Sequence, residues 1–269
     1  MKRQLSLWLL LVVSTGVSVT AAHAQTNPYD AEQRRLGHEV DVAIGSPHGL
    51  LPAIEMVRAY GLASPEVTAG ELQRLVAARG LAETRRSYLR WLAARVALRR
   101  GDRDGARRSV SELGFVTDFA VVGPFDNEGK TGFDEVYGPE EQRSQEFQPG
   151  MAFDGKEREV AWRSYPGETS DLGYVDFDAI FRPRENVCGY AQTTVTSARA
   201  QSLALLVGAG GAIRVWWNGE PVYADAAYRQ PDPERGAAVV QAQRGANRLL
   251  VKVCATDSTW GFYLRVADA

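Results

Sequence analysis

The spacing of apolar residues changes near Phe115, and this change predicts two regions of different structure. After residue 115 the sequence contains about nine short runs of apolar, aromatic and β-branched residues, and Gly, Pro, Asn or Asp separates most of them. "SLALLVGA", "IRVWWNG" and "NRLLVKVCAT" are three of these runs. Such spacing is typical of an antiparallel β-sandwich or jelly roll. We therefore expect this fold over residues 116–269, with the acidic, turn-rich residues 126–157 forming a long surface loop of little regular structure.

Residues 25–115 instead have the Ala, Leu, Arg and Glu content of helices. "TRRSYLRWLAARVALRRGDRDGARRSVSELG" predicts two helices joined by a turn at Gly101-Asp102. Residues 31–44 and 50–60 predict an earlier pair, with Pro47 and Gly49 ending one helix and starting the next. The predicted fold class is therefore α+β, with helical hairpins followed by an antiparallel sandwich.

The first residues predict export. Lys2 and Arg3 precede a short apolar run, and Ala22-His23-Ala24 precedes Gln25. This is the pattern of a secretory signal peptide over residues 1–24, and its apolar run is too short for a membrane anchor. We expect a mature chain that starts at Gln25, lacks a membrane span and resides in the periplasm or outside the cell.

Two resemblances extend these expectations. The helical pair around Gly101-Asp102 resembles a tetratricopeptide unit, whose stacked helices bind peptides. "GAGGAIRVWWNGEPVY", "GANRLLVKV" and "WGFYLRVAD" resemble the galactose-binding-like jelly roll, found as the sugar-binding domain of family 2 glycoside hydrolases and in accessory modules. Asn218-Gly219 and Gly245-Ala246-Asn247 carry that pattern.

"FAVVGPFDNEGKTGFDEVYGPE" is similar to a segment of larger exported bacterial proteins that combine tetratricopeptide repeats, this sandwich and a transglutaminase-like domain. The sequence ends just after its last predicted strand and so contains no transglutaminase-like Cys-His-Asp segment. The resemblance implies a fold more than a function.

Catalytic motifs are missing from the sequence. His38 and His48 are the histidines that follow the predicted signal, and both lie in the helical region. A Ser-His-Asp triad or a His-based zinc site is therefore not expected in the sandwich, and no cofactor or enzyme activity is predicted. Acidic pairs favour a solvated loop, with Ca²⁺ binding or glycoside hydrolysis as the alternatives; they are Asp126, Glu128, Asp134, Glu135, Asp176 and Asp178.

The pair Trp216-Trp217 raises the question of a sugar-binding face. Adjacent strand residues face opposite ways, so Trp217 shares a face with Ile213 and Val215 and is expected in the core. Trp216 is either an exposed stacking platform beside Arg214 and Asn218, or is covered by the segment around Trp162 and Tyr165. The candidate ligand-binding residues are Arg214, Trp216, Asn218, Tyr223, Tyr228 and Trp260.

Cys188 and Cys254 are the two cysteines, each in a predicted strand. An exported chain with an even number of cysteines predicts a disulfide between them, with two unpaired thiols as the alternative.

The sequence predicts a non-catalytic envelope scaffold that acts through its helical and sandwich surfaces on other envelope proteins. One alternative is a carbohydrate-binding module for peptidoglycan or polysaccharide, and another is the N-terminal accessory part of a longer protein. The net charge of −2, with arginines and acids mixed on the predicted helices, does not indicate nucleic-acid binding.

Overall fold

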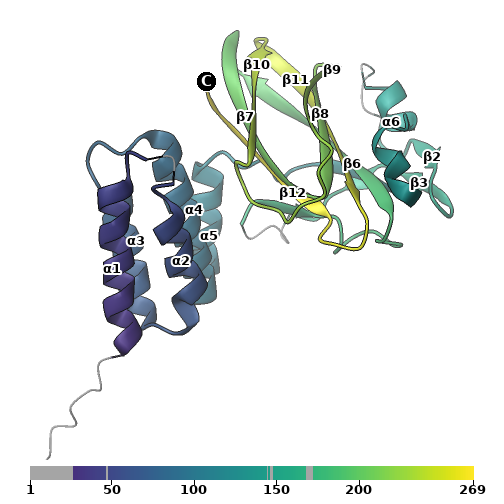
Figure 1. Ribbon diagram of the computed structural model, residues 1–269. Coiled ribbons are helices and arrows are strands. Elements are labelled where there is room, and N and C mark those ends of the chain that lie inside the picture. Colours follow the sequence, from purple (N-terminus) through teal and green to yellow (C-terminus); the bar gives the residue numbers. More distant parts are fainter. Residues whose placement is uncertain (1–26, 47, 144, 146–147, 168–171) are drawn as a thin grey trace, which may run out of the picture.

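The computed structural model describes residues 27–46, 48–143, 145, 148–167 and 172–269. It consists of a helical bundle followed by an antiparallel β-sandwich (Figure 1). The α+β fold class is therefore confirmed. The predicted signal peptide and Pro47 lie outside the described residues. None of the helices in the described part of the chain has the length and apolar content needed to cross a membrane.

The helices of the bundle pack their apolar faces together around Val40, Met56, Leu72 and Leu92. Their starts and ends follow local chemistry. The Asn27 side chain accepts a hydrogen bond from the backbone N–H of Tyr29, and Asp102 caps a later helix in the same way. The bundle consists of α1 (Pro28–Ala43), α2 (Leu51–Arg58), the 3₁₀ helix η1 (Ala59–Gly61), α3 (Pro65–Val76), α4 (Glu83–Arg99) and α5 (Arg103–Glu112).

Both predicted helical pairs are present, and Gly101 ends α4 with a φ of 88° that suits glycine. α3, which begins at Ser64-Pro65 and packs between α1 and α4, was not predicted. Because α3 lies there, α1 contacts both α2 and α3.

The sandwich has two main sheets. The six-stranded sheet has the order β4-β1-β6-β11-β8-β9, and the four-stranded sheet has the order β10-β7-β12-β5. All nine predicted runs form strands; two further short strands, β2 and β5, lie outside those runs. The strands are β1 (Ala120–Asp126), β2 (Ala152–Asp154), β3 (Glu159–Ala161), β4 (Arg163–Ser164), β5 (Tyr174–Asp176), β6 (Val187–Ser197), β7 (Gln201–Gly210), β8 (Ala212–Trp217), β9 (Glu220–Asp225), β10 (Gly236–Ala242), β11 (Gly245–Ala255) and β12 (Gly261–Asp268).

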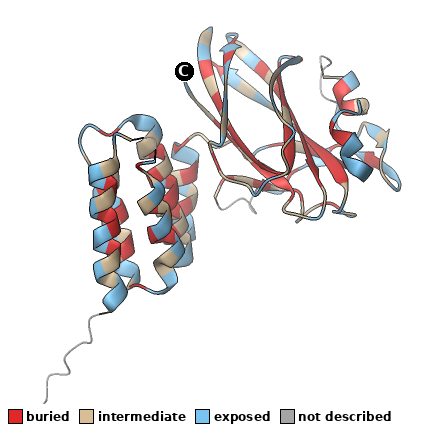
Figure 2. Ribbon diagram, in the orientation of Figure 1, coloured by how far each residue is buried: buried red, intermediate tan, exposed pale blue. Residues whose placement is uncertain are grey.

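Aromatic side chains fill the space between the two sheets. Trp260, Phe177 and Phe262 are fully buried there, and Trp260 and Phe177 meet edge to face at 5.3 Å. Ile213, Val215 and Trp217 of β8 point into the same core, as the strand periodicity predicts. Buried residues lie along both sheets and along the inward faces of the helices (Figure 2).

Residues 126–157, hereafter the cover segment, are not the open surface loop that was predicted. They contain η2 (Glu128–Phe133), α6 (Gly138–Glu141) and β2, and they lie over the outer face of the six-stranded sheet (Figure 1). The reason lies in that sheet: Tyr190, Trp216 and Leu250 point outward and form a second apolar cluster. Such a face needs a cover to exclude water.

A buried ion pair attaches the cover segment to this sheet. Lys252 of β11 is fully buried, and its Nζ donates to Glu140 Oε1 at 2.6 Å and to the Glu135 carbonyl at 2.6 Å. Tyr190 donates its hydroxyl to the same Glu140 carboxylate. Burial lowers the pKa of Lys252, and the Glu140 carboxylate opposes that shift.

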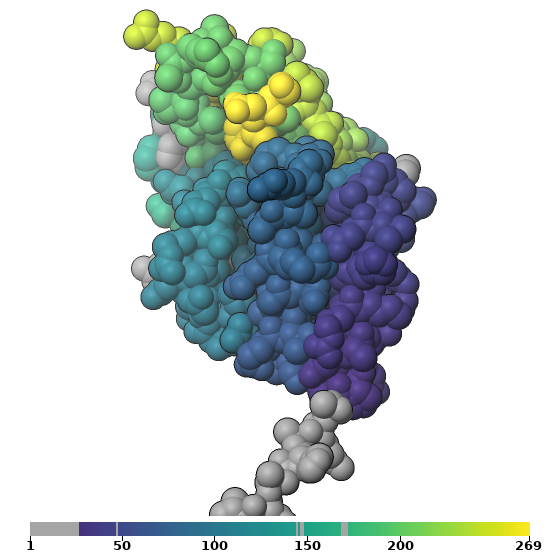
Figure 3. Space-filling model, turned by 90° about the vertical axis from the view of Figure 1, so that its left-hand side faces the viewer, coloured from purple at the N-terminus to yellow at the C-terminus, as the bar shows by residue number. Residues whose placement is uncertain are grey.

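The bundle packs against the outer face of the four-stranded sheet. Trp91 of α4 and Tyr263 of β12 meet edge to face at 5.8 Å, and Arg265 of β12 donates to the Leu113 carbonyl. Gly114 connects the two parts at a φ of 80°, where a Cβ would lie 2.6 Å from the Val266 carbonyl oxygen. Figure 3 shows the C-terminal segment, in yellow, directly against the blue helices. This close packing fixes the bundle relative to the sandwich.

A candidate binding groove between the bundle and the sandwich

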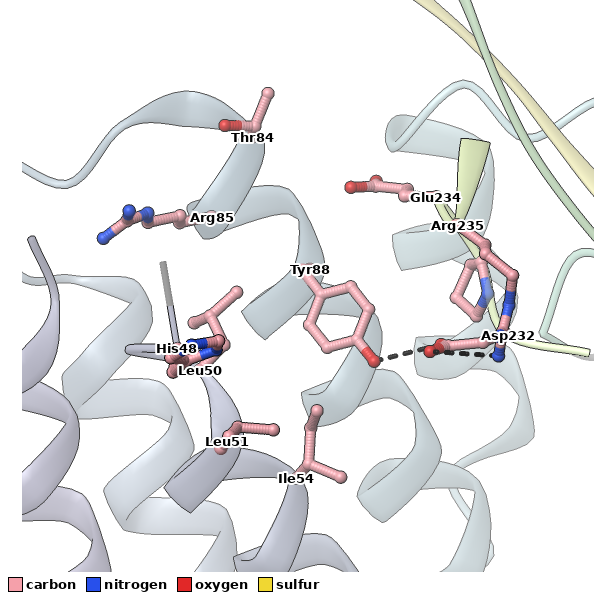
Figure 4. A pocket seen from close by; sticks show the side chains of 11 residues that line it. His48, Leu50, Leu51, Ile54, Thr84, Arg85, Tyr88, Asp232, Glu234 and Arg235 are labelled. Carbon is pink, nitrogen blue, oxygen red and sulfur yellow. Dashed lines mark hydrogen bonds and ion pairs between the residues drawn. The ribbon is translucent and has the colours of Figure 1, made fainter. Parts of the chain in front are cut away.

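A groove of about 330 Å³ lies where the bundle meets the sandwich (Figure 4). Three segments that are distant in sequence line it: residues 48–54 at the start of α2, residues 84–88 at the start of α4, and residues 232–235 before β10. We call it the junction groove. Its volume falls in the range of small-ligand and side-chain pockets.

The floor of the junction groove is apolar. Leu50, Leu51 and Ile54 lie on one side, and the Tyr88 ring lies between them and the loop of Asp232 (Figure 4). Leu51 is 55% exposed, and its neighbour Leu50 is partly buried. The floor therefore offers hydrophobic surface that a ligand could remove from water.

The carboxylates of the groove are already engaged by the protein. Asp232 Oδ1 accepts a hydrogen bond from the Tyr88 hydroxyl at 3.1 Å, and Asp232 Oδ2 lies 4.0 Å from Arg235 Nη2. Glu234 forms an ion pair with Arg265 at 2.5 Å. Burial raises the pKa of Glu234, and the Arg265 guanidinium opposes this shift. Burial and the Asp232 charge raise the pKa of Tyr88, so its hydroxyl remains a donor.

Arg85 differs from these carboxylates in having no ion partner among the described residues. It lines the groove on the side of His48, and its guanidinium forms no ion pair within the described part of the chain. Figure 4 shows Arg85 and His48 on one side of the groove and Asp232 and Arg235 on the other. The charge available to a ligand at the His48 side is therefore positive.

The loop that forms the sandwich side of the groove is held in a defined conformation. Glu234 has a φ of 62°, a value that non-glycine residues adopt rarely. Gly208 of β7 permits the approach, because a Cβ there would lie 1.7 Å from the Asp232 carbonyl oxygen. The groove wall is thus set by contacts with both β7 and α4.

The structure corrects two of the candidate ligand-binding residues. Trp260 is fully buried between the sheets, where its indole N–H donates to the Val253 carbonyl at 2.9 Å. Trp216 is 4% exposed and lies beneath the cover segment with Trp162, so the covered alternative holds. Tyr165 does not cover it, because Tyr165 belongs to the core between the sheets. Neither tryptophan presents a ring face to a ligand.

The other four candidates do not gather on one surface. Arg214 is paired with Asp134 at 3.0 Å, and Asn218, in the tight turn after β8, donates to Asn247 of β11. Tyr223 packs against the core between the sheets. The Tyr228 hydroxyl accepts a hydrogen bond from the Asn127 side chain of the cover segment at 3.1 Å. The continuous aromatic platform considered from the sequence is therefore not formed.

The predicted disulfide is confirmed. Cys188 of β6 and Cys254 of β11 are directly opposed in the sheet and bonded to each other. The bridge belongs to the outer cluster with Trp216 and Tyr190, under the cover segment.

Ion pairs hold several of the acidic residues singled out in the sequence. Lys156 contacts Asp126 at 3.2 Å and Glu128 at 2.7 Å. The Asp178 carboxylate accepts from the backbone N–H of Trp260. Across the described ranges, no three His, Cys, Asp or Glu side chains are arranged to hold a metal ion.

The junction groove could not be found from sequence patterns. Tyr88 reads as part of a helix stripe, and Asp232-Pro233 reads only as a turn. Their hydrogen bond joins residues 144 positions apart, and no local signal predicts such a contact.

Comparison with known proteins identifies no family. No family model and no curated protein matches the sequence. Among solved structures, a family 35 carbohydrate-binding module from Clostridium thermocellum is 21% identical, with a TM-score of 0.26 over 36% of this chain and 78% of that one. An uncultured Clostridium β-glucuronidase is 13% identical, with a TM-score of 0.34 over 56% of this chain and 28% of the enzyme. A Kluyveromyces marxianus β-glucosidase is 8% identical, with a TM-score of 0.34 over 56% and 16%. Similarities this low assign no ligand and no activity.

Proposed function

We propose that this chain is a non-catalytic, exported interaction protein that binds an extended segment of a partner protein in the junction groove. The segment carries apolar side chains and at least one carboxylate. The observation that supports this most directly is the combination of an apolar floor with Arg85, an arginine that forms no ion pair with any residue that the structure describes.

The apolar floor of the groove indicates that the ligand carries apolar groups. Leu51 is half exposed, and Leu50, Ile54 and the Tyr88 ring continue the same surface. A Leu or Val side chain buried there would contribute about 1.5–3 kcal/mol to binding before the entropic costs of association. The ligand therefore bears aliphatic or aromatic groups.

The charged side chains of the groove indicate that the ligand carries a carboxylate. Asp232 and Glu234 are satisfied by Tyr88, Arg235 and Arg265, so they do not require a basic ligand. Arg85 has the planar guanidinium that binds carboxylates through two parallel hydrogen bonds. Among the described groove residues, Arg85 is the charged side chain without an ion partner, and a ligand carboxylate at this end would supply that partner.

The packing around the groove supports binding without a large rearrangement. Trp91 and Tyr263 join the bundle to the sandwich, and the Trp91 indole N–H also donates to the Leu172 carbonyl at 3.1 Å. A groove formed before the ligand arrives loses less conformational entropy on binding. The burial of Trp216 and Trp260 supports this proposal over the carbohydrate alternative, because it removes the stacking faces that a sugar site would use.

The test uses two fluorescein-labelled peptides that differ only in charge, one alternating leucine with glutamate and one alternating leucine with lysine. Fluorescence anisotropy should show binding of the acidic peptide only. Arg85→Glu should weaken this binding by about tenfold or more. Arg79→Glu is the matched control, because Arg79 is exposed and lies outside the groove.

Equal effects of the two substitutions would contradict the proposal, as would equal binding of both peptides. Affinity for an insoluble polysaccharide that is unchanged by Arg85→Glu would instead favour the carbohydrate alternative.

A further inference from the structure

The disulfide of the sandwich lies beneath the cover segment and out of contact with solvent. Cys188 and Cys254 are both 0% exposed, although they belong to the outer cluster of the six-stranded sheet and not to the core between the sheets. Gly132 of η2 lies directly over the bridge, because a Cβ at that position would be only 2.9 Å from Cys188 Sγ. Reduction requires a thiolate to contact a sulfur atom, so η2 in this position blocks it.

η2 and α6 lie within residues 128–141, which are held on the sheet by side chains and not by strand pairing. In the described chain no backbone-to-backbone hydrogen bond joins residues 128–141 to the six-stranded sheet. Lys252 donates to the Glu140 carboxylate and to two carbonyls of the segment. The other ion pair, between Arg214 and Asp134, is weak, because the Asp134 side chain is 84% exposed. Loss of a few side-chain contacts would therefore release these residues without disturbing a strand.

The strands that carry the bridge are held much more firmly. β6 and β11 are paired along their whole length, and Cys188 lies opposite Cys254 within that ladder. Parting the two strands would break many backbone hydrogen bonds and open the core between the sheets. A segment with few contacts opens at a lower free-energy cost than the strands beneath it. The easiest route to the sulfur atoms is therefore the lifting of η2 and α6.

We propose that η2 and α6 form a lid that opens independently of the sandwich and controls the exchange of the Cys188–Cys254 disulfide with external dithiols. In the open state a thiolate of the dithiol attacks the Sγ of one cysteine, the S–S bond breaks, and the other cysteine leaves as a thiolate. The second thiolate of the dithiol then attacks the mixed disulfide and releases the first cysteine. The dithiol becomes a disulfide, and its two electrons reduce the two cysteines. With the lid closed, neither step takes place.

The rate at which dithiothreitol reduces the folded protein tests the proposal, with alkylation and intact mass analysis as the measurement. Glu140→Gln leaves Lys252 buried without a carboxylate partner only while the lid is closed, so it should favour opening and accelerate reduction by about tenfold or more. Glu128→Gln is the matched control on the same lid and should change the rate far less, because Glu128 is 63% exposed. Tyr190→Phe removes only the hydrogen bond to Glu140 and should accelerate reduction by a smaller factor than Glu140→Gln.

A second comparison separates lid opening from unfolding of the whole sandwich. Leu205→Ala removes a fully buried side chain from the core between the sheets and destabilises the sandwich as a whole. Without urea it should leave the reduction rate unchanged, because Leu205 does not belong to the cluster under the lid. The wild-type rate should also rise less steeply with urea than the unfolding equilibrium constant, since opening the lid exposes less surface than unfolding does.

Equal acceleration by Glu140→Gln and Leu205→Ala would overturn the proposal, because the bridge would then be reached only through unfolding of the sandwich. A reduction rate that follows the unfolding constant at every urea concentration would overturn it as well. So would a wild-type bridge that is reduced as fast in the folded chain as in the unfolded chain. The junction groove plays no part in these outcomes, because the peptide assay reports on it separately.

Discussion

The ion pair between Lys252 and Glu140 should be the point at which the cover segment is most sensitive to substitution. Both side chains are almost completely buried, at 0% and 5% exposed, and their charged atoms lie 2.6 Å apart. Glu140→Gln keeps the shape of the side chain and removes its charge. Lys252 would then be buried with only the Glu135 and Phe133 carbonyls and neutral groups as partners.

Removing one partner of a buried ion pair costs about 3–5 kcal/mol, because the remaining charge cannot regain its hydration. We therefore expect Glu140→Gln to lower the free energy of unfolding by about 3–5 kcal/mol, a large share of the ~5–15 kcal/mol of a typical domain. Lys252→Met should cost a similar amount. The double variant should cost less than the sum of the two, with a coupling of about 1–3 kcal/mol.

Urea unfolding followed by tryptophan fluorescence measures these values, because Trp216 and Trp162 lie in the cluster under the cover segment. Glu128→Gln is the matched control: it makes the same chemical change in the same segment, but Glu128 is 63% exposed beside Lys156 and should cost less than about 1 kcal/mol. If Glu140→Gln costs no more than the control, or if the double-variant costs simply add, the ion pair does not secure the segment.

Three further outcomes follow from residues that are wholly or partly buried. Trp216→Ala and Trp217→Ala should each cost about 3–5 kcal/mol in urea unfolding, since both side chains are 4% exposed; a much smaller loss for Trp216 would mean that the cover segment does not protect it. Replacing Cys188 and Cys254 by Ala should destabilise the chain by ~4 kcal/mol, given their separation of 66 residues, and an unchanged melting temperature would argue against this value. Burial raises the pKa of Asp176 above 3.8, so ionising its carboxyl costs stability as the pH rises through the folded-state pKa. Asp176→Asn should therefore be more stable than the wild type by a larger margin at neutral pH than below pH 3.8. Equal margins at both pH values in urea unfolding would refute the assignment.

Local patterns in the sequence were sufficient for the two regions and for most of their helices and strands, but not for α3 or for the helices of the cover segment. The change of apolar spacing near Phe115 correctly separates the helical bundle from the sandwich. Asn218-Gly219 correctly predicts the turn between β8 and β9, where both residues have positive φ. The alternation along β8 correctly places Trp217 in the core, because the pleat is a property of the strand itself. The cysteine count and the predicted compartment indicate the disulfide.

The tertiary structure decided which surfaces are covered. The sequence shows that Trp216 faces away from the core of the sandwich, but not that residues 126–157 fold back over it. Lys252 looks like an ordinary outward-facing strand residue until Glu140, 112 positions earlier, is brought to it. The junction groove arises in the same way, from Tyr88 and Asp232. Periodicity determines the direction of a side chain relative to its own strand or helix. What lies in that direction depends on contacts between distant segments, which no local pattern encodes.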